Sequence, residues 1–401
     1  MEFLMRRLLY LVLILTSVLG LVLSGCARRY RLNPDNLGDE RTWVCSRGSV
    51  AQTGASLTSE FDGRLHLLWE KGASGKPAGP LSIRYGVLVY PETRKKIKFY
   101  DLERGDYKGR TKARGVAQSG VAFSDSLAFW AVAPRRNCLF AQNLITNKRK
   151  WEVNIKDVHQ GPIIWDNRLV VSSGDGFLLA LDLNQGEAAW TFQAGQRLTA
   201  AASYGHGRIF QPADRGWLFA VSPDSGRELY RVKLDGPIVS AIAVADKVYV
   251  AVMTGQVYAL EPADGSIVWT TDLGHPIWTS PTVANGRVFV GHSGGQVVAL
   301  EAATGNVLWR YEAGAVIRSS ALVTGEYLVA GTMTGRLVVL KADDGTLADS
   351  TTLKGPIKAA PVTDGRRLLV ATEAGKIYCF GESDEQAGLA DKRVNPQLQS
   401  Q

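Results

Sequence analysis

Ser293 is the residue of this chain that most resembles a catalytic nucleophile. It stands in the run Gly291-His292-Ser293-Gly294-Gly295, which matches the G-x-S-x-G pattern of a hydrolase nucleophile elbow. That elbow works only on a turn between a strand and a helix, where the serine is held exposed. Here the residues on both sides are apolar and β-branched, and no helical pattern follows. We therefore predict that Ser293 lies in a hairpin turn between two strands.

Histidine and cysteine spacing indicates no metal site. The histidines at positions 66, 159, 206, 275 and 292 form no HxH or HExxH pattern, and no two cysteines form CxxC. Beyond Cys26 there remain Cys45, Cys138 and Cys379, an odd number that leaves either one disulfide with one free thiol or unpaired thiols. Cys379 stands in an apolar strand-like run and is expected to be a buried, small hydrophobic residue. The sequence thus predicts neither catalytic nor metal-binding residues.

A motif that recurs about every forty residues predicts the fold, and with it the positions of the serine, histidine and cysteine side chains. It reads Ala-Leu-x-x-x-x-Gly-x-x-x-Trp, and its copies end at positions 151, 190, 230, 269, 309 and 349, in steps of 39 or 40. Each repeat contains four short β-prone runs separated by Gly, Asp or Asn turns, which indicates a four-stranded antiparallel meander. Such a period is typical of a β-propeller. We expect the Trp residues on outer strands, packed against the next blade, and small-residue runs such as 238–244 as innermost strands.

The two ends of the repeat region determine the number of blades. The last unit, residues 356–381, has only three strand-like runs, whereas residues 64–70 form an isolated run that contains Trp69. Trp69 and Trp151 are two periods apart, so one degenerate blade lies between them, at about residues 80–115. We predict an all-β, eight-bladed β-propeller whose ring is closed by the N-terminal strand, which leaves no open sheet edge. Seven blades is the alternative, because the first two units repeat poorly.

The N-terminus resembles a bacterial lipoprotein signal peptide. Arg6 and Arg7 precede an apolar run of 16 residues that ends in Leu23-Ser24-Gly25-Cys26, which is similar to a lipobox. The resemblance implies that Cys26 is acylated and anchors the protein to a membrane. An uncleaved anchor helix and an ordinary secretory signal are the alternatives. Ala27 follows, not an aspartate, and this leaves the outer-membrane route open.

These features divide the chain into four parts. Residues 1–26 are the predicted signal peptide and 27–56 an extended linker. Residues 57–381 form the propeller, and 382–401 a polar, disordered tail.

Positive charge is concentrated before residue 159. Residues 27–158 contain 24 Lys and Arg against 13 Asp and Glu, a net charge of +11, whereas residues 159–401 have a net charge of −4. The basic clusters are Arg94-Lys95-Lys96, residues 108–114, Arg135-Arg136 and Lys148-Arg149-Lys150. Either these side chains are simply solvated, or this flank binds anionic lipid, lipopolysaccharide or an acidic partner. Nucleic acid is disfavoured for an exported protein.

The repeat resembles that of the pyrroloquinoline-quinone (PQQ) propeller superfamily, over roughly residues 57–381. Runs such as Leu181-Asp182 through Trp190 and Leu300-Glu301 through Trp309 carry the resemblance. One branch contains quinoprotein dehydrogenases, which need a catalytic aspartate, a calcium site and often adjacent cysteines. The other contains non-enzymatic lipoproteins similar to BamB of the outer-membrane β-barrel assembly machinery. The chain has no Cys-Cys pair, and its acidic residues fall mostly in turns. The lipobox, the linker and a single ring of this length favour the second branch.

This resemblance implies a lipid-anchored envelope scaffold in the outer membrane, facing the periplasm, that binds a barrel-assembly partner without catalysis and without PQQ. The partner is expected at loops on one face of the ring. Among the segments that lead into inner strands we single out Trp278, Arg318, Arg197 and Lys358 as partner-binding residues. Trp278 and Arg318 are of the residue types that dominate interface hot spots. The alternative is that these segments are ordinary structural linkers. The alternatives are a PQQ-dependent quinoprotein dehydrogenase and a propeller that binds anionic envelope glycan.

Overall fold

The computed structural model describes residues 29–34, 47–49, 51–56, 59–132, 138–158 and 160–382. The predicted signal peptide with Cys26 lies outside these residues, as does the predicted tail beyond Glu382. Cys45, the side chain of Cys138 and His159 also lie outside them. Among the described residues, no helix is long and apolar enough to cross a membrane.

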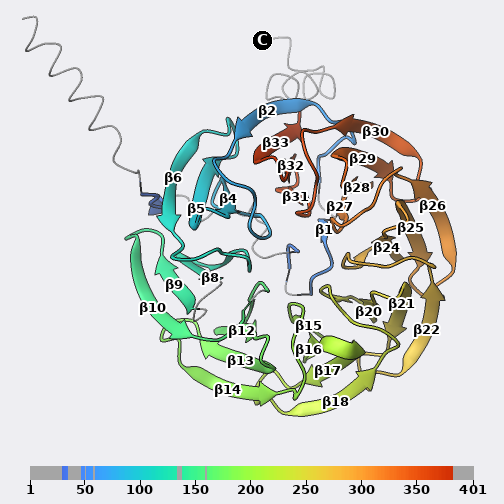
Figure 1. Ribbon diagram of the computed structural model, residues 1–401, viewed down its shortest axis with the longest axis horizontal. Coiled ribbons are helices and arrows are strands. Elements are labelled where there is room, and N and C mark those ends of the chain that lie inside the picture. Colours follow the sequence, from blue (N-terminus) through green and yellow to red (C-terminus); the bar gives the residue numbers. More distant parts are fainter. Residues whose placement is uncertain are drawn as a thin grey trace, which may run out of the picture.

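Eight antiparallel sheets stand side by side around a ring, as shown in Figure 1. Each blade has four strands, numbered from the axis outward. Blade I consists of β3 (Ser82–Arg84), β4 (Val87–Glu92), β5 (Lys96–Asp101) and β6 (Tyr107–Lys112), and blade II of β7 (Ala122–Ser124), β8 (Leu127–Ala131), β9 (Cys138–Asn143) and β10 (Lys148–Asn154). Blade III consists of β11 (Ile163–Trp165), β12 (Arg168–Ser172), β13 (Phe177–Asp182) and β14 (Ala188–Gln193), and blade IV of β15 (Ser203–Gly205), β16 (Arg208–Pro212), β17 (Trp217–Val221) and β18 (Glu228–Lys233). Blade V consists of β19 (Ala243–Val244), β20 (Val248–Ala251), β21 (Gln256–Leu260) and β22 (Ile267–Asp272). Blade VI consists of β23 (Thr282–Ala284), β24 (Arg287–Gly291), β25 (Gln296–Glu301) and β26 (Val307–Glu312). Blade VII consists of β27 (Leu322–Thr324), β28 (Tyr327–Gly331), β29 (Arg336–Lys341) and β30 (Leu347–Thr352).

Blade VIII joins the two ends of the propeller. Its inner strands are β31 (Val362–Thr363), β32 (Arg367–Ala371) and β33 (Lys376–Gly381), and its outer strand is β2 (Leu67–Gly72) from the N-terminal side. β2 runs antiparallel to β33, with Trp69 opposite Cys379. Figure 1 shows blue β2 lying across the red strands of this blade. The predicted eight blades and the closure by an N-terminal strand are confirmed, and the seven-bladed alternative is wrong.

The outer-strand tryptophans hold neighbouring blades together. Trp269 of blade V donates its indole N–H to the carbonyl oxygen of Ala302 in blade VI, at 2.9 Å. Gly305 of blade VI lies directly beneath this ring, and its left-handed φ of 76° favours glycine. The same indole-to-carbonyl bond joins Trp69 to Leu102, Trp151 to Leu183, Trp190 to Pro223 and Trp309 to Ala342. The glycine of the repeat is therefore a seat for the tryptophan of the preceding blade.

The innermost strands are shorter than we predicted. In blade V, the run 238–244 was expected to be a strand, but only Ala243–Val244 is one. The reason is that backbone near the axis is satisfied between blades by side chains: the Ser203 hydroxyl donates to the Ile242 carbonyl at 2.8 Å, and the Thr282 hydroxyl donates to that of Ala321 at 2.7 Å. Small hydroxyl residues thus form bonds from blade to blade where strands would not fit.

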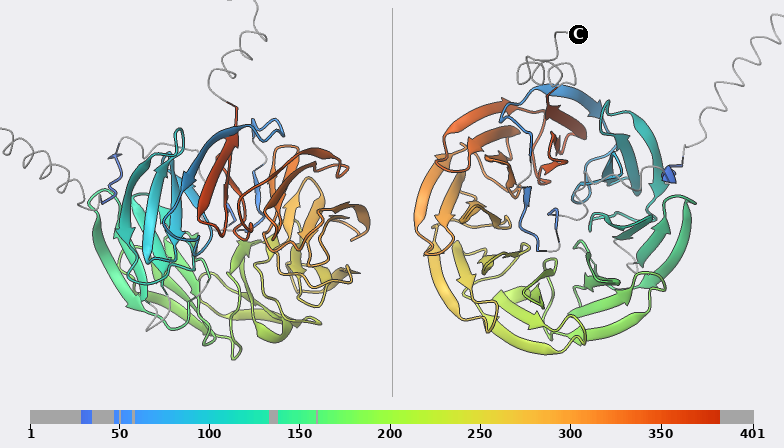
Figure 2. Two further views of the ribbon diagram at one scale, coloured as in Figure 1. Left: turned by 45° about the horizontal axis from the view of Figure 1, so that its top comes forward. Right: turned by 180° about the vertical axis from the view of Figure 1, so that it is seen from behind.

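Part of the predicted linker runs inside the ring. Strand β1 (Ala55–Ser56) adds in parallel to β27 on the axial side of blade VII. Backbone N–H groups of Val244 and Val283, in blades V and VI, donate to the carbonyls of Ala51 and Thr53, at 2.9 and 3.0 Å. Figure 2 shows this blue segment in the central opening, seen from behind. The described part of residues 47–56 is therefore packed against the inner strands of three blades.

Candidate functional site

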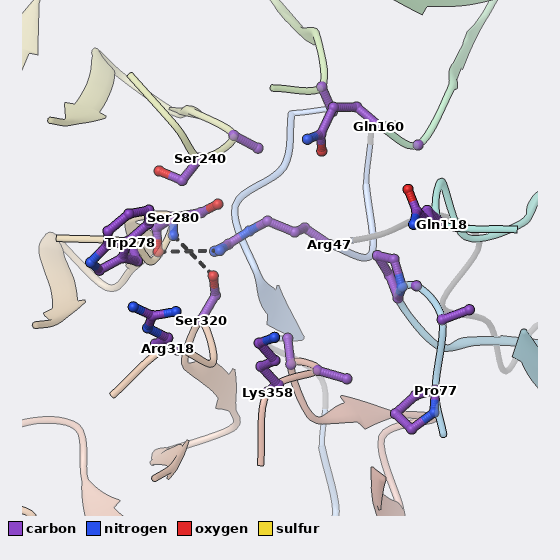
Figure 3. A pocket seen from close by; sticks show the side chains of 18 of the residues that line it. Arg47, Pro77, Gln118, Gln160, Ser240, Trp278, Ser280, Arg318, Ser320 and Lys358 are labelled. Atoms are coloured by element: carbon purple, nitrogen blue, oxygen red, sulfur yellow. Dashed lines mark hydrogen bonds between the residues drawn. The ribbon is translucent and has the colours of Figure 1, made fainter. Parts of the chain in front are cut away.

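A cavity of about 420 Å³ opens at the centre of the ring. Every blade contributes to its wall through the segment that leads into its inner strand, and the N-terminal segment contributes Arg47. Figure 3 shows the polar side chains that point toward this space, among them Gln118, Gln160 and Lys358. Because propellers bind ligands and partners at the ends of this channel through variable loops, the cavity and its rim are the candidate site.

Trp278, Arg318 and Lys358 occupy the same position in blades VI, VII and VIII. They are 40 residues apart and all line the cavity. The guanidinium carbon of Arg318 lies 4.8 Å from the centre of the Trp278 ring, a cation–π contact. Trp278 is 39% exposed, unlike the outer-strand tryptophans. We call these three residues the axial patch; an exposed indole stacked on an arginine is the type of surface that dominates binding at interfaces.

Arg197, the fourth residue predicted to bind a partner, does not line the cavity. Its guanidinium forms an ion pair with Asp157 at 3.0 Å. This contact joins two neighbouring inter-blade loops at the surface, so the structure brings together three of the four predicted residues and separates Arg197 from them.

Arg47 is central to the site, although the sequence patterns did not predict it. It is 5% exposed and donates to the carbonyl oxygens of Ser280 and Pro281, at 3.2 and 2.7 Å, and to the Thr282 hydroxyl at 2.9 Å. Its guanidinium thus fixes the N-terminal segment to blade VI. No local pattern marks Arg47, because it belongs to no repeat and its partners in blade VI lie more than 230 residues away.

The cavity wall carries more positive than negative charge. Arg47, Arg318 and Lys358 face one carboxylate, that of Glu373, which lies 3.8 Å from the Lys76 ammonium group. Calcium in a quinoprotein site requires several converging oxygen ligands. The lining residues offer one carboxylate, and no three His, Cys, Asp or Glu side chains gather to hold a metal anywhere in the described ranges. This donor set does not fit a calcium–quinone site.

Ser293 lies in the hairpin between β24 and β25, as predicted. Its hydroxyl donates to the Pro276 carbonyl, which ties the turn to the loop leading toward Trp278. The neighbouring His292 is fully buried, and its ring stacks on His275 with centres 5.0 Å apart. Burial, and next the positive charge that His275 can carry, lowers the pKa of His292 below its usual value. A buried, neutral imidazole therefore supports this loop, and the Ser293 hydroxyl is bonded to a backbone carbonyl.

Cys379 is completely buried in β33, the strand that pairs with the closing strand β2, and its thiol is free. Burial raises the pKa of this thiol far above its ordinary value, so it is held as the neutral, unreactive form. The prediction of a small hydrophobic residue is confirmed.

Comparison with known proteins agrees with this architecture. The sequence profile of outer membrane protein assembly factor BamB matches residues 67–207 and 214–385. No curated protein matches the chain. Among solved structures, BamB from Moraxella catarrhalis is 18% identical, with a TM-score of 0.69 over 80% of this chain and 100% of that one.

Quinoprotein enzymes share the same architecture. A europium-containing methanol dehydrogenase is 13% identical, with a TM-score of 0.74 over 87% of this chain and 99% of that one. A quinohemoprotein alcohol dehydrogenase from Pseudomonas putida is 12% identical, with a TM-score of 0.73 over 86% and 81% of the two chains. At these identities the structural matches show only a common PQQ-like propeller fold. The profile, in contrast, covers more than half of the sequence, and the chain therefore belongs to the family of outer membrane protein assembly factor BamB.

Proposed function

We propose that this protein is a non-enzymatic, lipid-anchored scaffold of the cell envelope that supports the assembly of outer-membrane β-barrel proteins. Family membership supports the general role. The observation that carries the proposal for this chain is the axial patch, where exposed Trp278 stacks on Arg318 beside Lys358 at the mouth of the cavity. This surface suits a protein partner that offers an apolar residue next to carboxylates.

Co-purification tests the proposal. The tagged full chain, extracted in mild detergent from its own cells, is expected to retain subunits of the barrel-assembly machinery. Trp278→Ala should reduce this retention, because truncating a hot-spot residue costs about 2 kcal/mol or more, roughly a thirtyfold loss of affinity. The matched control is Leu308→Ala, an exposed apolar residue on outer strand β26 that is 46% exposed and far from the axis. Retention of no assembly subunit would refute the function, and equal losses in both variants would refute the assignment to the axial patch.

The anchor is part of the same proposal. Cys26 follows a lipobox-like sequence, and several acyl chains bind a membrane stably where one does not. The mass of the N-terminal peptide should show that the chain begins at acylated Cys26, and Cys26→Ser should abolish that modification. An unmodified Cys26 in the mature protein would refute the anchor without affecting the partner test.

A quinoprotein enzyme is the second candidate, supported by the fold shared with two dehydrogenases. It predicts that PQQ with Ca²⁺ raises the melting temperature, since a ligand that binds only the folded state stabilises it. We expect no shift, because the cavity wall offers a single carboxylate. A concentration-dependent rise would favour the enzyme.

A further inference from the structure

Blade I lacks the tryptophan that joins most blades to their neighbours. In blade VI, Trp309 of the outer strand lies opposite Ala299 of the third strand. At the equivalent position of blade I, the outer strand has Gly109, which lies opposite Phe99. The seat in blade II is present nonetheless: Asn147 takes the place of the glycine with a φ of 56°, and the Leu144 carbonyl lies three residues before it. The seam between blades I and II thus has a seat and no indole from the preceding blade.

The N-terminal segment fills this gap. The ring of Tyr30 stacks on Phe99 with centres 3.9 Å apart and an interplanar angle of 9°. The backbone N–H of Leu32 donates to the Leu144 carbonyl at 2.9 Å, the oxygen that an indole N–H would reach in the other seams. Tyr30 and Leu32 are 5% and 2% exposed, so the segment is packed as tightly as the core.

The segment is bonded to both blades. The Tyr30 N–H donates to the Arg110 carbonyl of β6 at 3.2 Å, and the Asn147 amide of blade II donates to the Tyr30 carbonyl. Burial, and then the neighbouring Tyr85, raises the pKa of Tyr30 to about 12, consistent with an enclosed phenol. Residues 29–34 are therefore a fixed part of the rim of the ring.

Residues 29–34, which we call the dock, lie close in the sequence to the proposed anchor at Cys26. Only four residue steps separate Tyr30 from Cys26, and four residues span at most about 14 Å when fully extended. The seam between blades I and II is thereby held near the membrane, whereas the opposite blades lie a full ring diameter away, as Figure 1 shows. The fixed dock orients the ring.

Positively charged residues surround the dock. Arg29 and Arg31 flank Tyr30, Arg110 and Lys112 lie on β6, and Lys148 begins β10. The backbone of Arg29 forms a parallel β-bridge with that of Arg110, so the basic residues of the N-terminal segment lie beside those of β6. None of these five residues forms an ion pair with a carboxylate of the described chain. We call them the seam patch; a basic cluster beside a lipid anchor has the chemistry that binds anionic headgroups.

We propose that the seam patch rests on the anionic lipid surface of the membrane and that the docked Tyr30 segment holds the ring in that orientation. This inference rests on the lipid anchor of the proposed function. It makes the membrane the partner of the seam patch and leaves the axial patch to proteins.

Lysine footprinting of the full chain in vesicles tests the inference. The protein is reconstituted into phosphatidylcholine vesicles with or without phosphatidylglycerol, and acetylation of single lysines is followed by mass spectrometry. Lys112 and Lys148 should react several-fold more slowly with the anionic lipid, while the exposed Lys233 of blade IV and Lys341 of blade VII should not change. Salt at 1 M, where the Debye length is about 3 Å, should remove the protection.

Variants of Tyr30 test the role of the dock. Tyr30→Ala removes the ring stacked on Phe99 and should abolish the protection of Lys112, whereas Tyr30→Phe should preserve it. An unchanged melting temperature of the ring core in Tyr30→Ala separates undocking from unfolding. Protection that survives in Tyr30→Ala would refute the dock as the orienting element.

Three further outcomes would overturn the proposal. These are equal reactivity of Lys112 in both vesicles, equal protection of the lysines in all blades, and protection of Lys112 by soluble dextran sulfate but not by vesicles. The last would assign the seam patch to anionic glycan. The result is separable from the proposed function, because the mass of the N-terminal peptide reports on acylation and co-purification reports on protein partners.

Discussion

Replacing Gly305 with alanine should destabilise the propeller far more than the same change at Gly286, although both glycines lie in turns of blade VI. Both have left-handed backbone, with φ of 76° and 71°, so each alanine carries a strain of about 1–2 kcal/mol. A Cβ on Gly286 would meet no atom within 4 Å. A Cβ on Gly305 would lie 2.6 Å from the six-membered ring of Trp269.

The second alanine must therefore displace the indole. Overpacking costs about 1–3 kcal/mol, and loss of the 2.9 Å bond from Trp269 to the Ala302 carbonyl costs about 0.5–1.5 kcal/mol. We expect Gly305→Ala to lower the free energy of unfolding by about 2–4 kcal/mol more than Gly286→Ala. Urea unfolding followed by far-UV circular dichroism measures the difference. In a Trp269→Ala background the excess cost of Gly305→Ala should fall to the part caused by the Thr271 hydroxyl, which would lie 2.8 Å from the new Cβ. Equal costs of the two alanines in the native background would refute the inter-blade seat.

Three other predictions follow from buried groups. Lys98→Met should lower the free energy of unfolding by about 3–5 kcal/mol, since it leaves the fully buried Glu92 carboxylate, now 3.1 Å from the ammonium group, without its cationic partner. A loss in urea unfolding no larger than that of an exposed lysine would contradict this. The lowered pKa of His292, beside His275, means that the neutral ring stabilises the fold: its contribution is complete above the unfolded pKa of about 6.5 and is lost as the pH falls through the lower folded pKa. The melting temperature should thus fall from pH 7.5 to 5, and less so in His292→Gln; identical profiles would exclude this residue. Cys379, whose thiol pKa is raised by burial, should resist thiol reagents at pH 8 until the ring opens; labelling as fast as in urea would show that β2 does not hold the closure.

Much of the fold was predictable because it repeats. Each blade has the same packing requirements, which appear in the sequence as the forty-residue period, the repeated glycine and an outer-strand tryptophan such as Trp69. The structure of one blade could therefore be extended to the others. The lengths of the inner strands were not predictable, because Ser203 and Thr282 bond to residues 39 positions later. A residue pattern within one blade contains no information about that partner.

The candidate site was partly predictable for the same reason. Trp278, Arg318 and Lys358 lie at one position of the repeat, so their convergence on the axis follows from the period. Arg197 shares the type of segment, yet its side chain turns to Asp157, a choice between nearby partners that spacing does not decide.

From the sequence alone the class of fold and the strand that closes the ring could be predicted and eight blades were favoured over seven, because the backbone and packing requirements repeat in each unit. Only the tertiary structure decided what the non-repeating N-terminal residues do. Arg47 enters the channel and Tyr30 replaces a missing indole because distant blades leave an unsatisfied carbonyl or an empty seat there. Such complementarity arises between segments far apart in the chain and exists only once the ring has formed.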